Sequence, residues 1–330
     1  MGQIDILSVG DIVTDAFIKL LDDQAKVYED DQGKWLAMPF ATKIPFDHVE
    51  VVKAVGNASN AAVAFARLGL QTGFTTNVGG DAEGREMINT LHQAGVDTRF
   101  VHINPDKKSN YHYVLTYGAE RTILIKHEDY DYHWPRLRPT EMPRWIYFSS
   151  ISERAIDYHD EVADWLDENP GVRLAFQPGT YQMKAGTERL KRIYQRTEVL
   201  ILNREEAALV SGGSVEDVHD LFKRLHELGP KIVIITDGPN GAYASDIHTQ
   251  AVMPLYPDPA PPLERTGAGD AFASTLVAAL VKGLSLEEAL RWAPINSMSV
   301  VQKVGAQAGL LTEKQLLDYL QHAPEDYYPK

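Results

Sequence analysis

The sequence contains no cysteine and no long uninterrupted run of apolar residues. Without cysteine, the chain forms no disulfide, offers no thiolate to a metal and has no cysteine nucleophile. Because a membrane-spanning helix needs roughly 20 apolar residues, the sequence predicts no membrane partner. The first residues, 1–5, have neither the basic nor the apolar region of a secretory signal, so we expect a cytoplasmic protein.

Positive charge is also scarce. The 32 lysines and arginines are outnumbered by 46 aspartates and glutamates, which leaves a net charge of −14. General nucleic-acid binding needs a basic surface that displaces counterions, so we expect no nucleic-acid partner. A small anionic ligand needs only a local positive field and is not excluded.

The order of apolar patterns along the 330 residues predicts an α/β fold. Strand-like runs alternate with helical patterns, and this alternation is typical of a mostly parallel sheet covered by helices on both faces. We therefore expect one domain over 1–330, a three-layer α/β/α sandwich. The expected strands are 4–9, 72–78, 145–148, 172–176, 199–202 and 231–235.

Two stretches interrupt this alternation, at approximately 16–46 and 108–127. The first is charged and shows no helical period. In the second, residues 111–117 alternate with period two, and Gly118-Ala119-Glu120 suggests a hairpin turn. We expect both insertions to pair in a small separate β-sheet.

Two further expectations concern the C-terminal part. Pro294 should break or kink the helical pattern that begins at Leu286. The polar, tyrosine-rich tail 324–330 should be frayed.

The stretch Gly267-Ala268-Gly269-Asp270 opens an apolar helix. Glycine lets backbone N–H groups converge on an anion, and the helix N-terminus adds free donors and partial positive charge. A carboxylate there can act as a general base, which suits phosphoryl transfer to a hydroxyl. From this stretch alone, an aspartate that merely caps a glycine-rich turn is equally consistent.

Other polar residues follow the expected strands. Because the C-terminal ends of parallel strands meet at one edge, where ligands bind in open α/β sheets, these residues are candidate ligand contacts. They are Asp11, Asp15, Asn57, Asn60, Asn203, Glu206, Thr236, Gly238 and Gly241.

Three motifs together resemble the ribokinase-like (PfkB) carbohydrate kinases. They are Gly56–Gly69, Asn203-Arg204-Glu205-Glu206 and Thr266-Gly267-Ala268-Gly269-Asp270-Ala271-Phe272, and their order and spacing match the family over essentially the whole chain. The resemblance implies a ribokinase-like fold with a β-sheet lid. It also implies ATP-dependent phosphoryl transfer to a hydroxyl of a sugar or sugar-like alcohol.

The resemblance also implies roles for single residues. Asp270 is similar to the catalytic base, and Gly267, Ala268 and Gly269 to the anion hole. For the nucleotide and Mg²⁺, the implied residues are Asn203 and Glu206 at the metal and phosphates, Thr236, Gly238 and Gly241 in the nucleotide loop, and Asn296 at the adenine. For the sugar they are Asp15, Gly56, Asn57 and Asn60, with Asp11 nearby. ATP and Mg²⁺ are thus the implied cofactors.

A potassium ion is a further cofactor that some relatives bind. Here the implied site has Glu264, where aspartate is more usual, and the carbonyls of Val300, Lys303 and Gly305. Two other departures from the family pattern are Val55, where a glycine is usual, and Val13, which weakens ribose as the specific substrate.

Alternatives remain open at this point. A nucleoside kinase or a phosphosugar kinase would have the same fold, and the latter needs a cation near the lid, for which Arg121 and Lys126 are candidates. A non-catalytic sensor of sugar or nucleotide is the alternative outside enzymes. The apolar strand 111–117 also suggests a homodimer formed through the lid.

Overall fold

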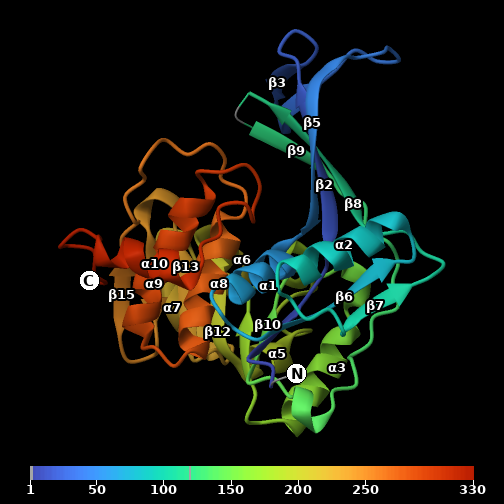
Figure 1. Cartoon of the computed structure of the whole chain (residues 1–330). Helices are drawn as coiled ribbons and strands as arrows, with labels where there is room; N and C mark the ends of the chain where they lie inside the picture. The colour runs from blue at the N-terminus through green and yellow to red at the C-terminus, as the bar shows by residue number, and fades with distance from the viewer. Residues whose placement is uncertain (1–2, 119) are drawn as a thin grey trace.

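The computed structural model describes residues 3–118 and 120–330 (Figure 1). Met1, Gly2 and Ala119 lie outside the described residues, and with them the start of the N-terminal segment and the middle of the expected hairpin turn.

A large sheet forms the centre of the body. Within the described residues it has nine strands in the order β15-β14-β13-β12-β11-β10-β1-β6-β7. Neighbours from β13 to β7 pair in parallel, while β14 and β15 add an antiparallel edge. The strands are β1 (Ile6–Val9), β6 (Thr72–Gly79), β7 (Val101–Asn104), β10 (Trp145–Phe148), β11 (Arg173–Phe176), β12 (Thr197–Asn203), β13 (Ile232–Thr236), β14 (Ala242–Ser245) and β15 (Gln250–Met253).

Helices cover both faces of this sheet, which confirms the three-layer α/β/α expectation. Successive residues of one strand enter different cores: Ile6 packs with α1, α8, α9 and α10, whereas Leu7 packs with α3, α5, α6 and α7. Each strand is therefore apolar on both sides, as a parallel sheet between two helix layers requires. The helices are α1 (Asn57–Arg67), α2 (Ala82–Gln93), α3 (Tyr158–Glu168), α4 (Thr180–Ala185), α5 (Lys191–Arg196), α6 (Arg204–Ser211), α7 (Val218–Glu227), α8 (Ala268–Val281), α9 (Leu286–Val300) and α10 (Glu313–Gln321).

A second sheet, which we call the lid, projects from the body (Figure 1). Its order is β5-β2-β8-β9, from β5 (Phe46–Val55), β2 (Val13–Leu20), β8 (Tyr111–Tyr117) and β9 (Glu120–Leu124). Strand β2 pairs in parallel with β8, so the two insertions form one small sheet as expected. The lid strands reach beyond the expected first insertion, from Val13 to Val55, and a separate hairpin, β3 (Lys26–Asp30) with β4 (Gly33–Ala37), lies within it.

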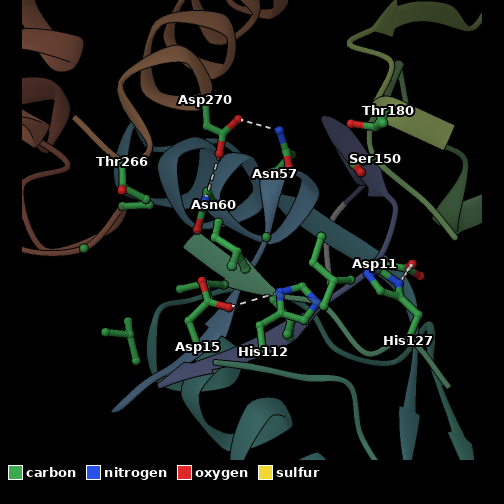
Figure 2. Close-up of a pocket in the computed structure, with 18 of the residues that line it drawn as sticks. Asp11, Asp15, Asn57, Asn60, His112, His127, Ser150, Thr180, Thr266 and Asp270 are labelled. Atoms are coloured by element: carbon green, nitrogen blue, oxygen red, sulfur yellow. Dashed lines mark hydrogen bonds and ion pairs between the residues drawn. The ribbon is translucent and has the colours of Figure 1, made fainter. Parts of the chain in front are cut away.

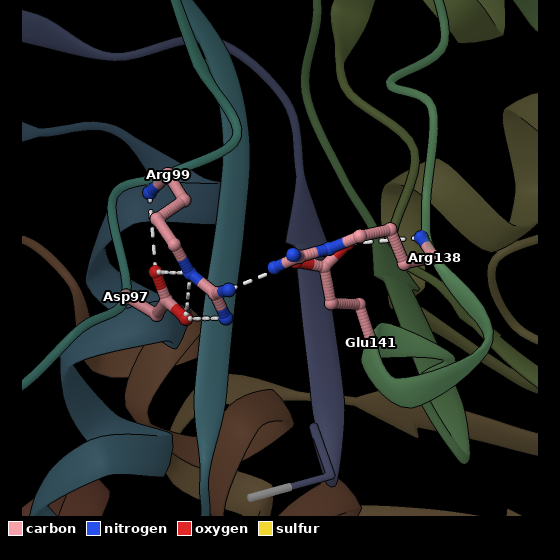
Figure 3. A network of polar contacts seen from close by, with 4 residues as sticks. All are labelled: Asp97, Arg99, Arg138 and Glu141. Atoms are coloured by element: carbon pink, nitrogen blue, oxygen red, sulfur yellow. Dashed lines mark hydrogen bonds and ion pairs between the residues drawn. The ribbon is translucent and has the colours of Figure 1, made fainter. Parts of the chain in front are cut away.

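A polar network ties the segment that follows the lid to the body (Figure 3). The Glu141 carboxylate accepts hydrogen bonds from the backbone N–H and guanidinium of Arg138 and from Arg99, each at 2.9 Å. Arg99 also contacts Asp97 through both carboxylate oxygens. The hydrogen bonds from Arg138 lower the pKa of Glu141 to about 2, so this carboxylate stays ionised at neutral pH.

Two sequence-based expectations are wrong. Helix α9 runs unbroken through Pro294, which costs it one backbone hydrogen bond but leaves Ile295 and Trp292 packed in the core. The tail is not frayed: Tyr327 is 2% exposed, its hydroxyl donates to the Arg291 carbonyl, and Lys330 exchanges two backbone hydrogen bonds with Val252. The Tyr327 ring is buried in the hydrophobic core, and this burial anchors the tail.

Across residues 3–118 and 120–330, no helix is both long enough and apolar enough to cross a membrane.

Candidate active site

The site begins where the strand order of the large sheet reverses. Strands β1 and β10 are neighbours in the sheet. The strands that follow β1, namely β6 and β7, lie on one side of this pair, and those that follow β10, from β11 to β15, lie on the other. Ligands bind at such switch points because the two diverging connections leave a crevice at the strand ends. Asp11 follows β1 and Ser150 follows β10, and the N–H of Asp11 donates to the Ser150 carbonyl at 3.0 Å.

A cavity of about 410 Å³, the lid-side cavity, opens beneath the lid at this point (Figure 2). Its walls come from the lid strands, the first turns of α1 and α8, and helix α4. All five expected sugar contacts line it. Its lining includes Asp11, Val13, Asp15, Phe17, Val52, Gly56, Asn57, Asn60, His112, Ile123, His127, Ser150, Thr180, Tyr181, Lys184, Thr266, Asp270 and Gly305.

A second cavity of about 230 Å³, the strand-end cavity, lies at the C-terminal ends of β12 and β13. It brings together residues expected at the nucleotide, the metal and the anion hole. Its lining is Asn57, Gln177, Ile201, Leu202, Asn203, Glu206, Thr236, Gly267, Gly269 and Asp270. Asn57 and Asp270 line both cavities, so Asp270 stands where the two meet.

Asp270 is held by amide donors (Figure 2). Asn57 Nδ2 donates to Oδ1 at 3.0 Å, Asn60 Nδ2 donates to Oδ2 at 2.9 Å, and Gln177 Nε2 lies 3.4 Å from Oδ1. Burial raises the pKa of Asp270 above its ordinary value, although the hydrogen bonds from Asn60, Gln177 and Asn57 oppose this shift. A carboxylate with a raised pKa is a stronger base.

The first turn of α8 is preceded by Gly267, whose backbone adopts the left-handed conformation. Gly267 has φ = 79°, and a Cβ there would lie 2.3 Å from the Ala306 Cβ, so this position requires glycine. Gly267 and Gly269 face the strand-end cavity. Ala268 does not line either cavity, and its N–H points toward the Arg265 carbonyl at 3.4 Å.

Asn203 and Glu206 form a reciprocal cap at the start of α6. Asn203 Oδ1 accepts from the Glu206 N–H at 2.8 Å, and Glu206 Oε2 accepts from the Asn203 N–H at 2.9 Å. Burial, together with the nearby Asp270 charge, raises the pKa of Glu206. The cap occupies one carboxylate oxygen and leaves Oε1 for a cation. The described residues contain no cluster of three or more histidine, aspartate or glutamate side chains that could hold a metal ion.

The nucleotide-loop candidates lie at the end of β13 and directly after it. Thr236 lines the strand-end cavity, and Gly238 begins a three-residue 3₁₀ turn that ends before Gly241. Gly241 has φ = 90°, and a Cβ there would meet the Met253 carbonyl oxygen at 2.2 Å. The geometry of this turn therefore depends on glycine.

Asn296 needs a correction. Its side chain is 0% exposed, its amide donates to Thr275 Oγ1 at 2.8 Å, and its Oδ1 accepts from the Leu311 N–H at 2.9 Å. With both polar atoms bonded inside the protein, the side chain has no surface to offer to an adenine ring. Helical periodicity alone did not reveal that this residue faces α8.

Of the four expected potassium ligands, Glu264 and Gly305 are in direct contact. Glu264 Oε2 accepts from the Gly305 N–H at 3.0 Å, and its other oxygen accepts from the Thr266 hydroxyl. Val300 is the last residue of α9, and its carbonyl accepts from the Lys303 N–H at 3.1 Å. Of these four residues, Gly305 lines the lid-side cavity.

Several lining residues were missed by sequence reasoning. Gln177 and Thr180 follow β11, so the strand-end rule could have found them. His112 alternates with apolar neighbours on β8, which indicated its face but not its role. His127, Tyr181 and Lys184 carry no motif. The proposed phosphosugar contacts Arg121 and Lys126 line neither cavity, and Lys126 pairs with Glu128 at 2.6 Å.

Comparison with known proteins agrees with this geometry. Residues 48–313 match the model of the pfkB family carbohydrate kinases. The chain belongs to the PfkB family. It is thus a carbohydrate kinase of this family, a transferase that uses an alcohol as acceptor.

Relatives of this PfkB chain include sugar and nucleoside kinases. It is 25% identical over 274 residues to the ribokinase of Haemophilus influenzae, covering 81% of this chain and 87% of that one. It is 24% identical over 262 residues to a nucleoside kinase of Methanothermobacter thermautotrophicus, covering 77% and 80%.

Solved structures show the same fold. Arabidopsis thaliana ribokinase complexed with ribose and ATP has a TM-score of 0.79 at 20% identity, covering 97% of this chain and 99% of that one. A putative ribokinase II from E. coli in complex with ATP and Mg²⁺ has a TM-score of 0.75 at 18% identity, with the same coverage.

The pH dependence of catalysis should follow the environment of Asp270. Because its pKa is raised, we expect the acidic limb of kcat/KM to lie above pH 3.8, with activity lost as the pH falls through it. Asn60→Ala removes a donor that favours the ionised form, so the limb should move to higher pH. The measurement is a pH profile of kcat/KM beside that of Asn89→Ala, which alters an exposed amide on α2. An unmoved limb in Asn60→Ala would contradict Asp270 as the titrating base.

Proposed function

We propose that the chain transfers the γ-phosphoryl group of ATP to a hydroxyl of a sugar or sugar-like alcohol. The observation that carries this proposal is the position of Asp270, which lines both cavities. The acceptor hydroxyl loses its proton to Asp270 while its oxygen bonds to the γ-phosphorus. The bond from that phosphorus to the β,γ-bridging oxygen breaks, and ADP leaves.

The strand-end cavity supports the phosphate end of this reaction. N–H groups at the start of α8, at Gly267 and Gly269, would stabilise charge on the transferring phosphoryl group. Glu206, with Asn203 beside it, would hold Mg²⁺ and its waters. When bound, Mg²⁺ neutralises the phosphate oxygens. Thr236 and the turn from Gly238 to Gly241 would contact the nucleotide.

The lid-side cavity would hold the acceptor. Asp15, Asn57 and Asn60 supply carboxylate and amide groups that bond to hydroxyls, and Gly56 lets the backbone approach closely. The ribokinase relative favours a sugar, and the nucleoside kinase relative makes a nucleoside the second candidate. Asp270 and Glu206 are both present and their surroundings are complete, which favours an enzyme over a binding sensor.

Removal of the base tests the proposal. Asp270→Asn keeps the size of the side chain and removes the proton acceptor, so kcat should fall about a hundredfold or more while ATP binding stays. A coupled assay of ADP formation over sugars and nucleosides, with calorimetric titration of ATP, measures both. Asp258→Asn, at an exposed position, is the control. Near-normal turnover in Asp270→Asn would refute this role.

We also propose a potassium site at Glu264 with the carbonyls of Val300, Lys303 and Gly305. The contacts of Glu264 with Thr266 and Gly305 support it, because they connect the carboxylate to the loop just before α8. A cation there would stabilise the residues that carry the anion hole. Activity should rise severalfold in potassium chloride relative to tetramethylammonium chloride at equal ionic strength. Equal rates in both salts would remove potassium from the proposal.

We further propose that two copies pair through the outer face of the lid. Strand register places two rows of side chains on the face opposite the cavity: Val51, Ala16, Tyr113 and Leu124, then Val49, Ile18, Leu115 and Thr122. Val51, Tyr113 and Leu124 are 45%, 48% and 52% exposed. A second copy supplies an identical apolar sheet face, and two such faces can pack.

Sedimentation at micromolar concentration tests this pairing. The native chain should sediment as a dimer, and Tyr113→Glu should shift it to monomer because a charge would be buried in the interface. Lys43→Glu, in an exposed lid loop, should leave the dimer unchanged. A native chain that stays monomeric would contradict the proposed pairing through the lid.

A further inference from the structure

The wall of the lid-side cavity that lies away from Asp270 carries two histidines (Figure 2). His127 Nδ1 lies 3.1 Å from Asp11 Oδ2, and His112 Nδ1 lies 3.3 Å from Asp15 Oδ1. The two imidazole rings are 5.2 Å apart between centroids. Each carboxylate thus stands beside an imidazole.

Asp11 accepts three hydrogen bonds from within the protein. Its Oδ1 accepts from the Tyr132 hydroxyl at 2.8 Å, and its Oδ2 accepts from the Ser152 N–H at 2.8 Å as well as from His127. Because a carboxylate only accepts, we assign a proton to His127 Nδ1, which leaves Nε2 for a ligand. Asp11 therefore orients His127.

Lys184 brings an ammonium group to the same cavity from α4. Its Nζ lies 5.7 Å from the centroid of the Tyr181 ring, and the His127 ring lies 6.1 Å from that same ring. Tyr181 thus has an ammonium on one side and an imidazole on another. Within residues 3–118 and 120–330, no carboxylate lies within ion-pair distance of Lys184, and no other lysine or arginine lines this cavity.

We propose that the acceptor is anionic: a polyhydroxy compound whose carboxylate or phosphate lies at the ammonium of Lys184, while one of its hydroxyls donates to Nε2 of His127. This inference rests on the kinase function proposed above and names its substrate class. A neutral sugar offers this ammonium only hydroxyl acceptors, whereas an anionic group gives a stronger, charge-assisted hydrogen bond. In a chain of net charge −14, an anionic acceptor also requires a local positive field in order to approach.

The first experiment compares matched acceptors. Each sugar is supplied as the neutral compound, as its aldonic acid and as its terminal phosphate ester, alongside nucleosides, and ADP formation is measured. We expect kcat/KM for one anionic form to exceed that of the neutral sugar about tenfold or more. The acid and ester arms identify the anion.

The outcomes of this comparison separate the two proposals. Preference for neutral sugars or nucleosides would overturn the anionic acceptor and leave the kinase function standing. Failure to phosphorylate any acceptor would contradict the kinase function itself.

The second experiment replaces the ammonium. Lys184→Met keeps the length of the side chain and should lower kcat/KM for the anionic acceptor about ten- to a hundredfold, mainly through KM. Lys184→Arg should recover part of the loss. Lys223→Met removes an exposed lysine of α7 that lines neither cavity and should have no effect. If Lys184→Met weakened neutral and anionic acceptors equally, Lys184 would have only a structural role and the inference would fail.

Discussion

The whole site depends on two amide hydrogen bonds that reach Asp270 across the fold. Asn57 and Asn60 lie one turn apart on α1, 213 and 210 positions from Asp270 in the sequence. This spacing puts both amides on one face of the helix, opposite the first turn of α8. The interaction positions the carboxylate and at the same time joins the N-terminal and C-terminal halves of the chain.

Burial of Asp270 has an energetic cost. A carboxyl whose pKa rises on folding favours the folded state when it is protonated, so this contribution is lost as the pH rises through the raised pKa. The ionised form of Asp270 is therefore held at the expense of stability. The amides of Asn57 and Asn60 offset part of that cost, because they donate to the charged form.

Local sequence patterns predicted the features that depend on residues close together in the sequence. The strand 145–148 matches β10, and alternating strands and helices indicated the layers correctly. Gly267 was predicted from its place in the Gly-Ala-Gly-Asp motif. The structure gives the physical reason, because the backbone conformation at this position leaves no room for a Cβ. Pairing of β2 with β8 could be expected from composition, because neither insertion suits a parallel sheet.

Features that depend on contacts between residues far apart in the sequence were not predicted. Tyr327 is buried only because Tyr256 and α9 leave a site for it, and Asn296 is enclosed only because Thr275 and Leu311 reach it. The same holds for Lys184, which lies on a short helix without a motif and enters the cavity through the packing of α4. A cavity wall is assembled from several elements, so no single stretch of sequence describes it.

The carboxylates of the site explain how so acidic a chain can receive phosphate groups. Several of them accept hydrogen bonds from donors of their own, which reduces the negative charge that a ligand meets. Asp11 is bonded to Tyr132, Ser152 and His127, Glu206 to the N–H of Asn203, and Glu264 to Thr266 and Gly305. Gly267 and Gly269, at the start of α8, line the strand-end cavity beside these residues. The field inside the two cavities, rather than the net charge of −14, thus determines which ligands approach Asp270.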